Sequence, residues 1–118
     1  MNEACLDLLR REEGFIGKMK TEIEPYVRDR MTEGNYLSKD GMNLHWLHFE
    51  ADQPHKTVLL IHGFSEFWQK YYEMLFYFLQ SGYSIWMPEL RGHGDSEREV
   101  DDPSLVHVGS FRDYIADI

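Results

Sequence analysis

Apolar side chains recur along this chain in two different periods, and the change between them predicts where helices give way to strands. Over residues 3–13 the apolar positions fall on one side at helical spacing, and Gly14 follows where such a helix would end. Pro25 interrupts the next stretch, because proline lacks the amide hydrogen that a helix interior needs. We therefore expect residues 1–32 to form a helical extension, in which the helix over residues 3–13 packs on the outside of the fold.

After this helical part the pattern changes to short extended runs separated by turn residues. Residues 35–38 and 42–50 flank Asp40-Gly41, a dipeptide that supplies the positive φ angles of a tight hairpin turn. The apolar face of the second run switches near Trp46, which favours a β-bulge at that point. The sequence therefore predicts an antiparallel hairpin with a bulge in its second strand.

A helical repeat between two apolar runs predicts a βαβ unit. Residues 57–61 form a continuous apolar run, typical of a strand buried on both faces of a parallel sheet. Residues 68–79 repeat aromatic and leucine side chains at helical spacing, and Gly82 follows where a left-handed cap would end the helix. Residues 83–87 form a second apolar run, so the two strands should lie parallel, joined by a right-handed crossover.

The aromatic residues of the predicted helix have a packing explanation. Trp68, Tyr71 and Tyr72 share one helical face, which favours contact with the sheet over a ligand site. A further helical period runs through residues 111–118 to the end of the sequence without a capping residue. We therefore expect the chain to stop inside a helix.

Composition narrows the class of protein. The 118 residues suit one domain, and the 42% hydrophobic content predicts a packed core. The formal net charge of -9 opposes nucleic-acid binding, which rests mainly on Lys and Arg at phosphates. Cys5 is the single cysteine, and the N-terminus carries acids where a signal peptide needs a basic region. With no apolar stretch near the roughly 20 residues that span a bilayer, we expect a cytoplasmic protein without stable membrane insertion.

The tripeptide His62-Gly63-Phe64 directly follows the first predicted parallel strand. Backbone amides at the carboxyl end of such a strand can face the crevice where ligands bind in open α/β sheets. The amide of Phe64 is therefore a candidate donor to the oxyanion of a tetrahedral intermediate, a contribution of about 3 kcal/mol. The alternative is an ordinary strand-to-helix turn in which Gly63 merely permits the bend.

A second glycine-bearing motif, Leu90-Arg-Gly-His-Gly-Asp-Ser96, follows the second predicted parallel strand. Together with Ile61-His-Gly-Phe-Ser-Glu66, it resembles the α/β-hydrolase superfamily in its lysophospholipase and monoacylglycerol-lipase-like branch, of the serine aminopeptidase S33 type. The resemblance covers residues 33–118. It implies the N-terminal part of an α/β-hydrolase fold, in which an antiparallel hairpin precedes the βαβ unit of a mostly parallel sheet.

The resemblance also implies roles for the residues of both motifs. Phe64 would supply one oxyanion-hole amide, His62 and Gly63 would shape the turn, and Glu66 would support it. The second motif would be a structural loop near the site that makes local hydrogen bonds and transfers no proton. Its residues are Arg91, Gly92, His93, Gly94, Asp95 and Ser96.

The nucleophile of the family lies in Gly-x-Ser-x-Gly at a strand-to-helix elbow, followed in the chain by an Asp or Glu and a His. This sequence contains no such motif. In the family the elbow comes after one more helix and strand, so we expect the catalytic residues to lie beyond Ile118. The chain is then predicted to be inactive alone.

We expect neither a metal ion nor a cofactor. The six histidines are spread along the chain without a His-Glu-x-x-His pattern or a cysteine pair. Gly92-His-Gly94 continues with Glu97 where a dinucleotide motif needs its third glycine. No Gly-Lys-Ser/Thr phosphate loop is present either.

Two hypotheses follow. The first is an N-terminal segment of a serine hydrolase whose complete form acts on a small ester or lipid, such as a lysophospholipid or monoacylglycerol. The second is a non-catalytic remnant, or a module that completes its sheet with a partner chain. By the family's strand order, the strand over residues 57–61 has one open edge here, which favours self-association.

Overall fold

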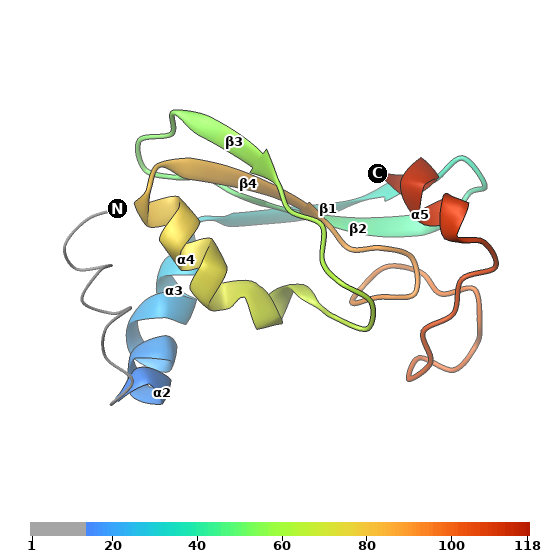
Figure 1. Ribbon diagram of the computed structural model, residues 1–118, viewed down its shortest axis with the longest axis horizontal. Coiled ribbons are helices and arrows are strands. Elements are labelled where there is room, and N and C mark those ends of the chain that lie inside the picture. The colour runs from blue at the N-terminus through green and yellow to red at the C-terminus, as the bar shows by residue number, and fades with distance from the viewer. Residues whose placement is uncertain (1–13) are drawn as a thin grey trace.

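The computed structural model describes residues 14–118 and contains one mixed four-stranded sheet (Figure 1). The strand order is β1-β2-β4-β3, with β1 and β2 antiparallel and β3 parallel to β4. The strands are β1 (Met31–Leu37), β2 (Asn43–Phe49), β3 (Lys56–Leu59) and β4 (Tyr83–Pro88). The predicted hairpin and the predicted parallel βαβ unit are thus confirmed, whereas the helix predicted over residues 3–13 lies outside the described residues.

The crossover between β3 and β4 is helical, as its apolar spacing predicts. A short 3-10 turn, η2 (Trp68–Tyr71), leads into α4 (Tyr72–Gln80), and Gly82 beyond it has a left-handed φ of +83°. Trp68 and Tyr72 are buried in the core, and Tyr71 packs against its edge. The core explanation of these aromatic residues is therefore confirmed.

The helical stretch before the sheet is continuous through Pro25, contrary to the interruption predicted there. It consists of α2 (Phe15–Lys18), a π-helical turn η1 (Met19–Ile23) and α3 (Glu24–Asp29). Pro25 sits in the first turn of α3, where a missing amide hydrogen costs little. Ile23 and Val27 are fully buried in the same core as α4, so this helical stretch shares the core with the sheet.

The predicted bulge near Trp46 is wrong. The β1–β2 register runs without a break from Met31 opposite Phe49 to Leu37 opposite Asn43. The apparent switch of face arises because the polar residue His45 lies on the same face as Leu47 and Phe49. Its imidazole is buried beside carboxylates, which allows a polar residue at that position.

The strand β3 is an edge strand, and the prediction that both its faces are buried is wrong. Leu59 is 58% exposed and Val58 is only partly buried. Within the described residues no further strand pairs beside β3, which explains this exposure.

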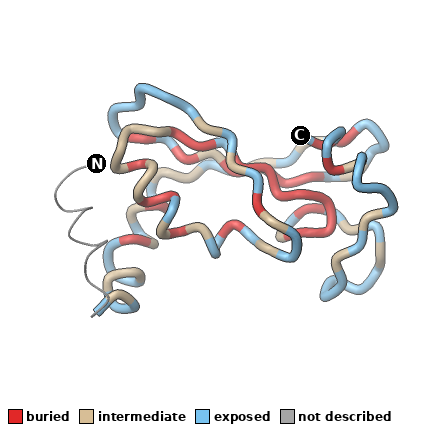
Figure 2. The backbone as a smooth tube through the Cα atoms, viewed as in Figure 1, coloured by how far each residue is buried: buried red, intermediate tan, exposed pale blue. Residues whose placement is uncertain are grey.

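The carboxyl ends of β3 and β4 lead into the loops that carry both motifs. In Figure 2 the buried residues of β4 continue into the loop that follows it, as far as His93. The chain then reaches α5 (Phe111–Asp117), which confirms the helix predicted from the last period and lies near the tip of the hairpin (Figure 1). None of the described helices is long and apolar enough to cross a bilayer.

The candidate oxyanion turn and its supporting loop

Residues 62–66 form a tight turn between β3 and η2, which we call the oxyanion turn after its predicted role. The Gly63 amide donates to Glu66 Oε1 at 3.0 Å and to the Tyr71 hydroxyl at 3.3 Å. The Tyr71 hydroxyl in turn donates to Glu66 Oε1 at 3.0 Å. A Cβ at Gly63 would collide with the Glu66 carboxylate, so glycine allows this amide and the carboxylate to lie close together.

The Phe64 amide differs from its neighbours in the oxyanion turn. The amides of Gly63, Ser65 and Glu66 all donate to protein acceptors. Among the residues that the structure describes, the Phe64 amide has no acceptor. Ser65, which follows it, is held at a left-handed φ of 62°, an uncommon conformation for a residue with a side chain.

Two buried histidines join the oxyanion turn to the loop after β4. His62 Nε2 accepts the Leu90 amide at 2.9 Å, and His93 Nε2 accepts the Ser65 amide at 2.9 Å. Burial is the main cause that lowers the pKa of His93, with the nearby His62 and Arg98 acting in the same direction. Sequence analysis placed both histidines near the site but did not identify the amides that they accept.

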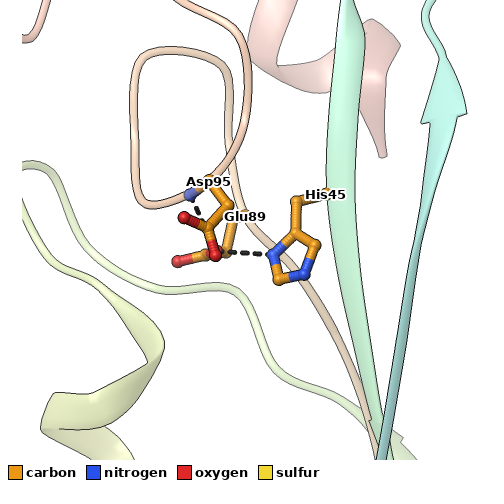
Figure 3. Close-up of side chains that lie close together, drawn as sticks. All are labelled: His45, Glu89 and Asp95. Atoms are coloured by element: carbon orange, nitrogen blue, oxygen red, sulfur yellow. Dashed lines mark hydrogen bonds and ion pairs between the residues drawn. The ribbon is translucent and has the colours of Figure 1, made fainter. Parts of the chain in front are cut away.

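We call the loop after β4, residues 91–96, the supporting loop. The buried carboxylate of Glu89 lies at its centre (Figure 3). Its Oε1 lies 2.7 Å from His45 Nδ1 on β2 and accepts the Asp95 amide at 3.2 Å. The three side chains bring their imidazole nitrogen and carboxylate oxygens within 4.8 Å of one another. A Cβ at Gly94 would collide with the Glu89 carboxylate, so the loop closes over it only because that residue is glycine.

Sequence analysis missed both Glu89 and His45. The available signal was the polar residue His45 in phase with Leu47 and Phe49, which was interpreted as a bulge. Ser96, which sequence analysis did place in the loop, fastens it to β2: its Oγ accepts the His45 amide at 2.8 Å and donates to the Glu89 carbonyl at 2.6 Å.

Arg91 ties the supporting loop to two distant segments. Its guanidinium donates to both oxygens of Asp117 in α5 at 2.7 Å, and to Asp40 in the hairpin turn at 2.9 and 3.1 Å. A further bond at 3.0 Å reaches Glu99. Hydrogen bonds from Arg91 first, and then from Ser38, lower the pKa of Asp40 to about 2, and the carboxylates raise the pKa of Arg91.

The structure thus brings the two predicted sets of residues together. The oxyanion turn (His62, Gly63, Phe64 and Glu66) faces the loop of Arg91, Gly92, His93, Gly94, Asp95 and Ser96 across the two histidine contacts. An open cavity of about 310 Å³ lies between them, lined in part by Ser65, Phe67, His93 and Arg98. Sequence analysis did not assign Ser65, although it is a contact point between the two loops.

This arrangement of an antiparallel hairpin, a parallel βαβ unit and two loops at the carboxyl ends of its strands is that of the N-terminal part of an α/β-hydrolase fold. An epoxide hydrolase from Vigna radiata shares the fold, with a TM-score of 0.55 and 24% identity over 75% of this chain and 27% of its own. The chain belongs to the serine aminopeptidase S33 family, which matches residues 52–118.

Several curated proteins are similar to this chain in sequence. Lysophospholipase L2 of Escherichia coli is 28% identical over 108 residues, which are 92% of this chain and 32% of the relative. Phospholipase YtpA of Bacillus subtilis is 31% identical over 59% of this chain and 25% of its own. Epoxide hydrolase 3 of Siraitia grosvenorii is 37% identical over 58% and 22%. The chain therefore spans a third or less of the length of these relatives.

Proposed function

We propose that this chain is the N-terminal segment of a serine hydrolase that acts on carboxylic esters of the lysophospholipid or monoacylglycerol class. The observation that carries the proposal is the uncommitted Phe64 amide between three neighbours that are all hydrogen-bonded. A donor that is fixed in place and free of other acceptors is what a developing oxyanion requires, because no reorganisation is then needed during reaction.

The choice of ester chemistry rests on the relatives. Lysophospholipase L2 and phospholipase YtpA are named for phospholipid substrates, and a carboxyl esterase from Bacillus coagulans has a TM-score of 0.53 at 25% identity over 56% of this chain and 22% of its own. Epoxide hydrolases also match, so the first part of the fold serves more than one chemistry. The proposed triad residues would come from the part of the enzyme after Ile118.

Phe64→Pro in the complete enzyme tests the oxyanion role, because proline removes the amide hydrogen. We expect kcat to fall by about 10²–10³, the usual effect of losing one oxyanion donor. Phe64→Ala is the matched control, since it keeps the amide and should cost at least about tenfold less. Thermal melting shows whether each variant is folded. Unchanged kcat in a folded Phe64→Pro enzyme would refute the role.

A serine-reactive phosphonate probe tests whether the nucleophilic serine lies outside these 118 residues. The complete enzyme should be labelled, whereas the 118-residue chain alone should not, because it contains no Gly-x-Ser-x-Gly. Labelling of the 118-residue chain would overturn this part of the proposal and would place a reactive serine within it.

The second candidate function is a non-catalytic module that completes its sheet with another chain. It is favoured by the open edge of β3, where Leu59 is 58% exposed at the end of the sheet. An exposed apolar strand edge pairs readily with another strand. Under this alternative the Phe64 substitutions would leave the association of the chain unchanged.

A further inference from the structure

His62 and His93 make the same contact in opposite directions between the two loops. His62 belongs to the oxyanion turn and accepts a backbone amide of the loop after β4, that of Leu90. His93 belongs to that loop and accepts a backbone amide of the oxyanion turn, that of Ser65. The two imidazole rings lie 4.7 Å apart, and both side chains are almost fully buried. Together they form a reciprocal clasp.

The partners of each ring determine where its protons lie. A backbone amide only donates, so the Nε2 atoms that accept from Leu90 and Ser65 carry no proton. Each Nδ1 lies near a carbonyl oxygen, that of Gly63 at 2.8 Å for His62 and that of Arg91 at 3.0 Å for His93. A carbonyl only accepts, so both Nδ1 atoms carry the proton. Both imidazoles are therefore neutral and share one tautomer.

The surroundings of His93 oppose a second proton. The rings of Phe64 and Tyr114 pack near it, and burial is the main cause that disfavours its positive form, with His62 and the Arg98 guanidinium acting in the same direction. Among the described residues no carboxylate hydrogen-bonds to either imidazole of the clasp. A cation formed at Nε2 would also direct its new N–H at the amide that it now accepts.

We propose that His62 and His93 are positioning residues that hold the oxyanion turn only as neutral imidazoles. Protonation of His93 releases the Ser65 amide and with it the left-handed conformation beside Phe64, and protonation of His62 releases the Leu90 amide. The consequence for catalysis rests on the proposed function, whereas the clasp itself does not. The turn is thus built to come apart in acid without any change in the catalytic triad.

Scalar coupling across the N–H···N hydrogen bonds tests the clasp directly in the ¹⁵N-labelled 118-residue chain. Near neutral pH we expect correlations from the Ser65 amide to His93 Nε2 and from the Leu90 amide to His62 Nε2. Because burial lowers the pKa of His93, the Ser65 correlation should persist below the pH at which free histidine is protonated and should disappear when His93 Nε2 gains its proton. A protonated Nε2 on either ring near neutral pH, or a Ser65 correlation that persists after His93 Nε2 is protonated, would overturn the proposal.

His93→Gln tests whether loss of the Ser65 hydrogen bond in acid requires protonation of residue 93. The glutamine amide oxygen can accept the Ser65 amide but cannot be protonated. We expect the Ser65 hydrogen-exchange protection factor to fall at least tenfold in acid in the wild type and to change much less in His93→Gln. His107→Gln, at an exposed histidine outside the clasp, is the matched control and should behave as the wild type. Equal acid dependence in all three proteins would refute the role of His93.

In the complete enzyme the catalytic histidine sets the first acid limb of the kcat/KM profile, so the clasp should add a second, steeper loss of kcat/KM at lower pH. This second loss should be absent in His93→Gln and present in His107→Gln, and equally steep profiles in both variants would refute the link between the clasp and catalysis. A confirmed clasp with unchanged kcat in Phe64→Pro would refute the oxyanion role alone, so the two proposals fail separately.

Discussion

Arg91 and Asp117 form a bidentate ion pair in which the guanidinium Nε and one terminal nitrogen each lie 2.7 Å from a carboxylate oxygen. Both side chains are buried, at 3% and 2% exposure. A buried pair of this geometry is costly to break because the remaining charge cannot return to water. The contact therefore fastens α5 to the loop that supports the oxyanion turn.

Asp117→Asn should lower the free energy of unfolding by about 2 kcal/mol, because Arg91 loses its most buried partner but keeps the carboxylates of Asp40 and Glu99. Chemical denaturation of the 118-residue chain measures this change. The matched control is Asp52→Asn at the ion pair of Arg30, where the Asp52 side chain is 66% exposed. That substitution should cost less than about 1 kcal/mol, as for surface pairs. Similar losses in both variants would contradict the proposed importance of burial.

Gly94→Ala should destabilise the chain more than Gly41→Ala. Both glycines have positive φ angles, 51° and 87°, so both substitutions carry backbone strain. Only at Gly94 would the new Cβ collide with the Glu89 carboxylate, whereas Gly41 has open space around it. We expect the difference in unfolding free energy to be about 2 kcal/mol, typical of overpacking. Equal losses would show that the supporting loop can move away from Glu89.

Leu59→Lys should weaken self-association of the 118-residue chain, measured as the concentration dependence of its sedimentation. The Leu60 amide donates to the Trp86 carbonyl, so by the alternation of a strand the Leu59 amide is directed to the free edge of β3. A lysine there opposes edge-to-edge pairing.

Leu105→Lys is the control for surface charge. Leu105 is 53% exposed, similar to Leu59, but it lies in a loop outside the sheet. It should leave association unchanged. If both lysines act alike, or if the wild-type chain is monomeric at all concentrations, pairing through β3 is wrong.

The elements that sequence analysis predicted correctly are those with local signals. Asp40-Gly41 predicts the turn of the β1–β2 hairpin from two adjacent residues. The apolar runs on either side of α4 predict that β3 and β4 are parallel. The contacts that it missed join residues far apart in the sequence: His45 and Glu89 are 44 positions apart, and Arg91 and Asp117 are 26. No local period marks such pairs, because each residue is an ordinary polar position until the fold brings the partner to it.

Sequence analysis was wrong where the surroundings of a segment decide its state. The apolar run of β3 indicates a buried strand, yet its exposure depends on what lies beside it in the sheet. Pro25 indicates a break, yet the first turn of a helix tolerates it. The roles of Phe64, Glu66 and the supporting loop stay predictions that the proposed substitutions test.

The three-way contact of Arg91 with Asp40, Asp117 and Glu99 also sets an order of events during synthesis. The hairpin turn and the loop emerge from the ribosome well before Asp117, which supplies the most buried of the three carboxylates. The Tyr36 hydroxyl donates to the Asp117 carbonyl, 81 positions later in the chain, so this hydrogen bond also forms only after Asp117 has been made. The hairpin turn and the supporting loop therefore reach their final charge balance only after all four described strands have been made.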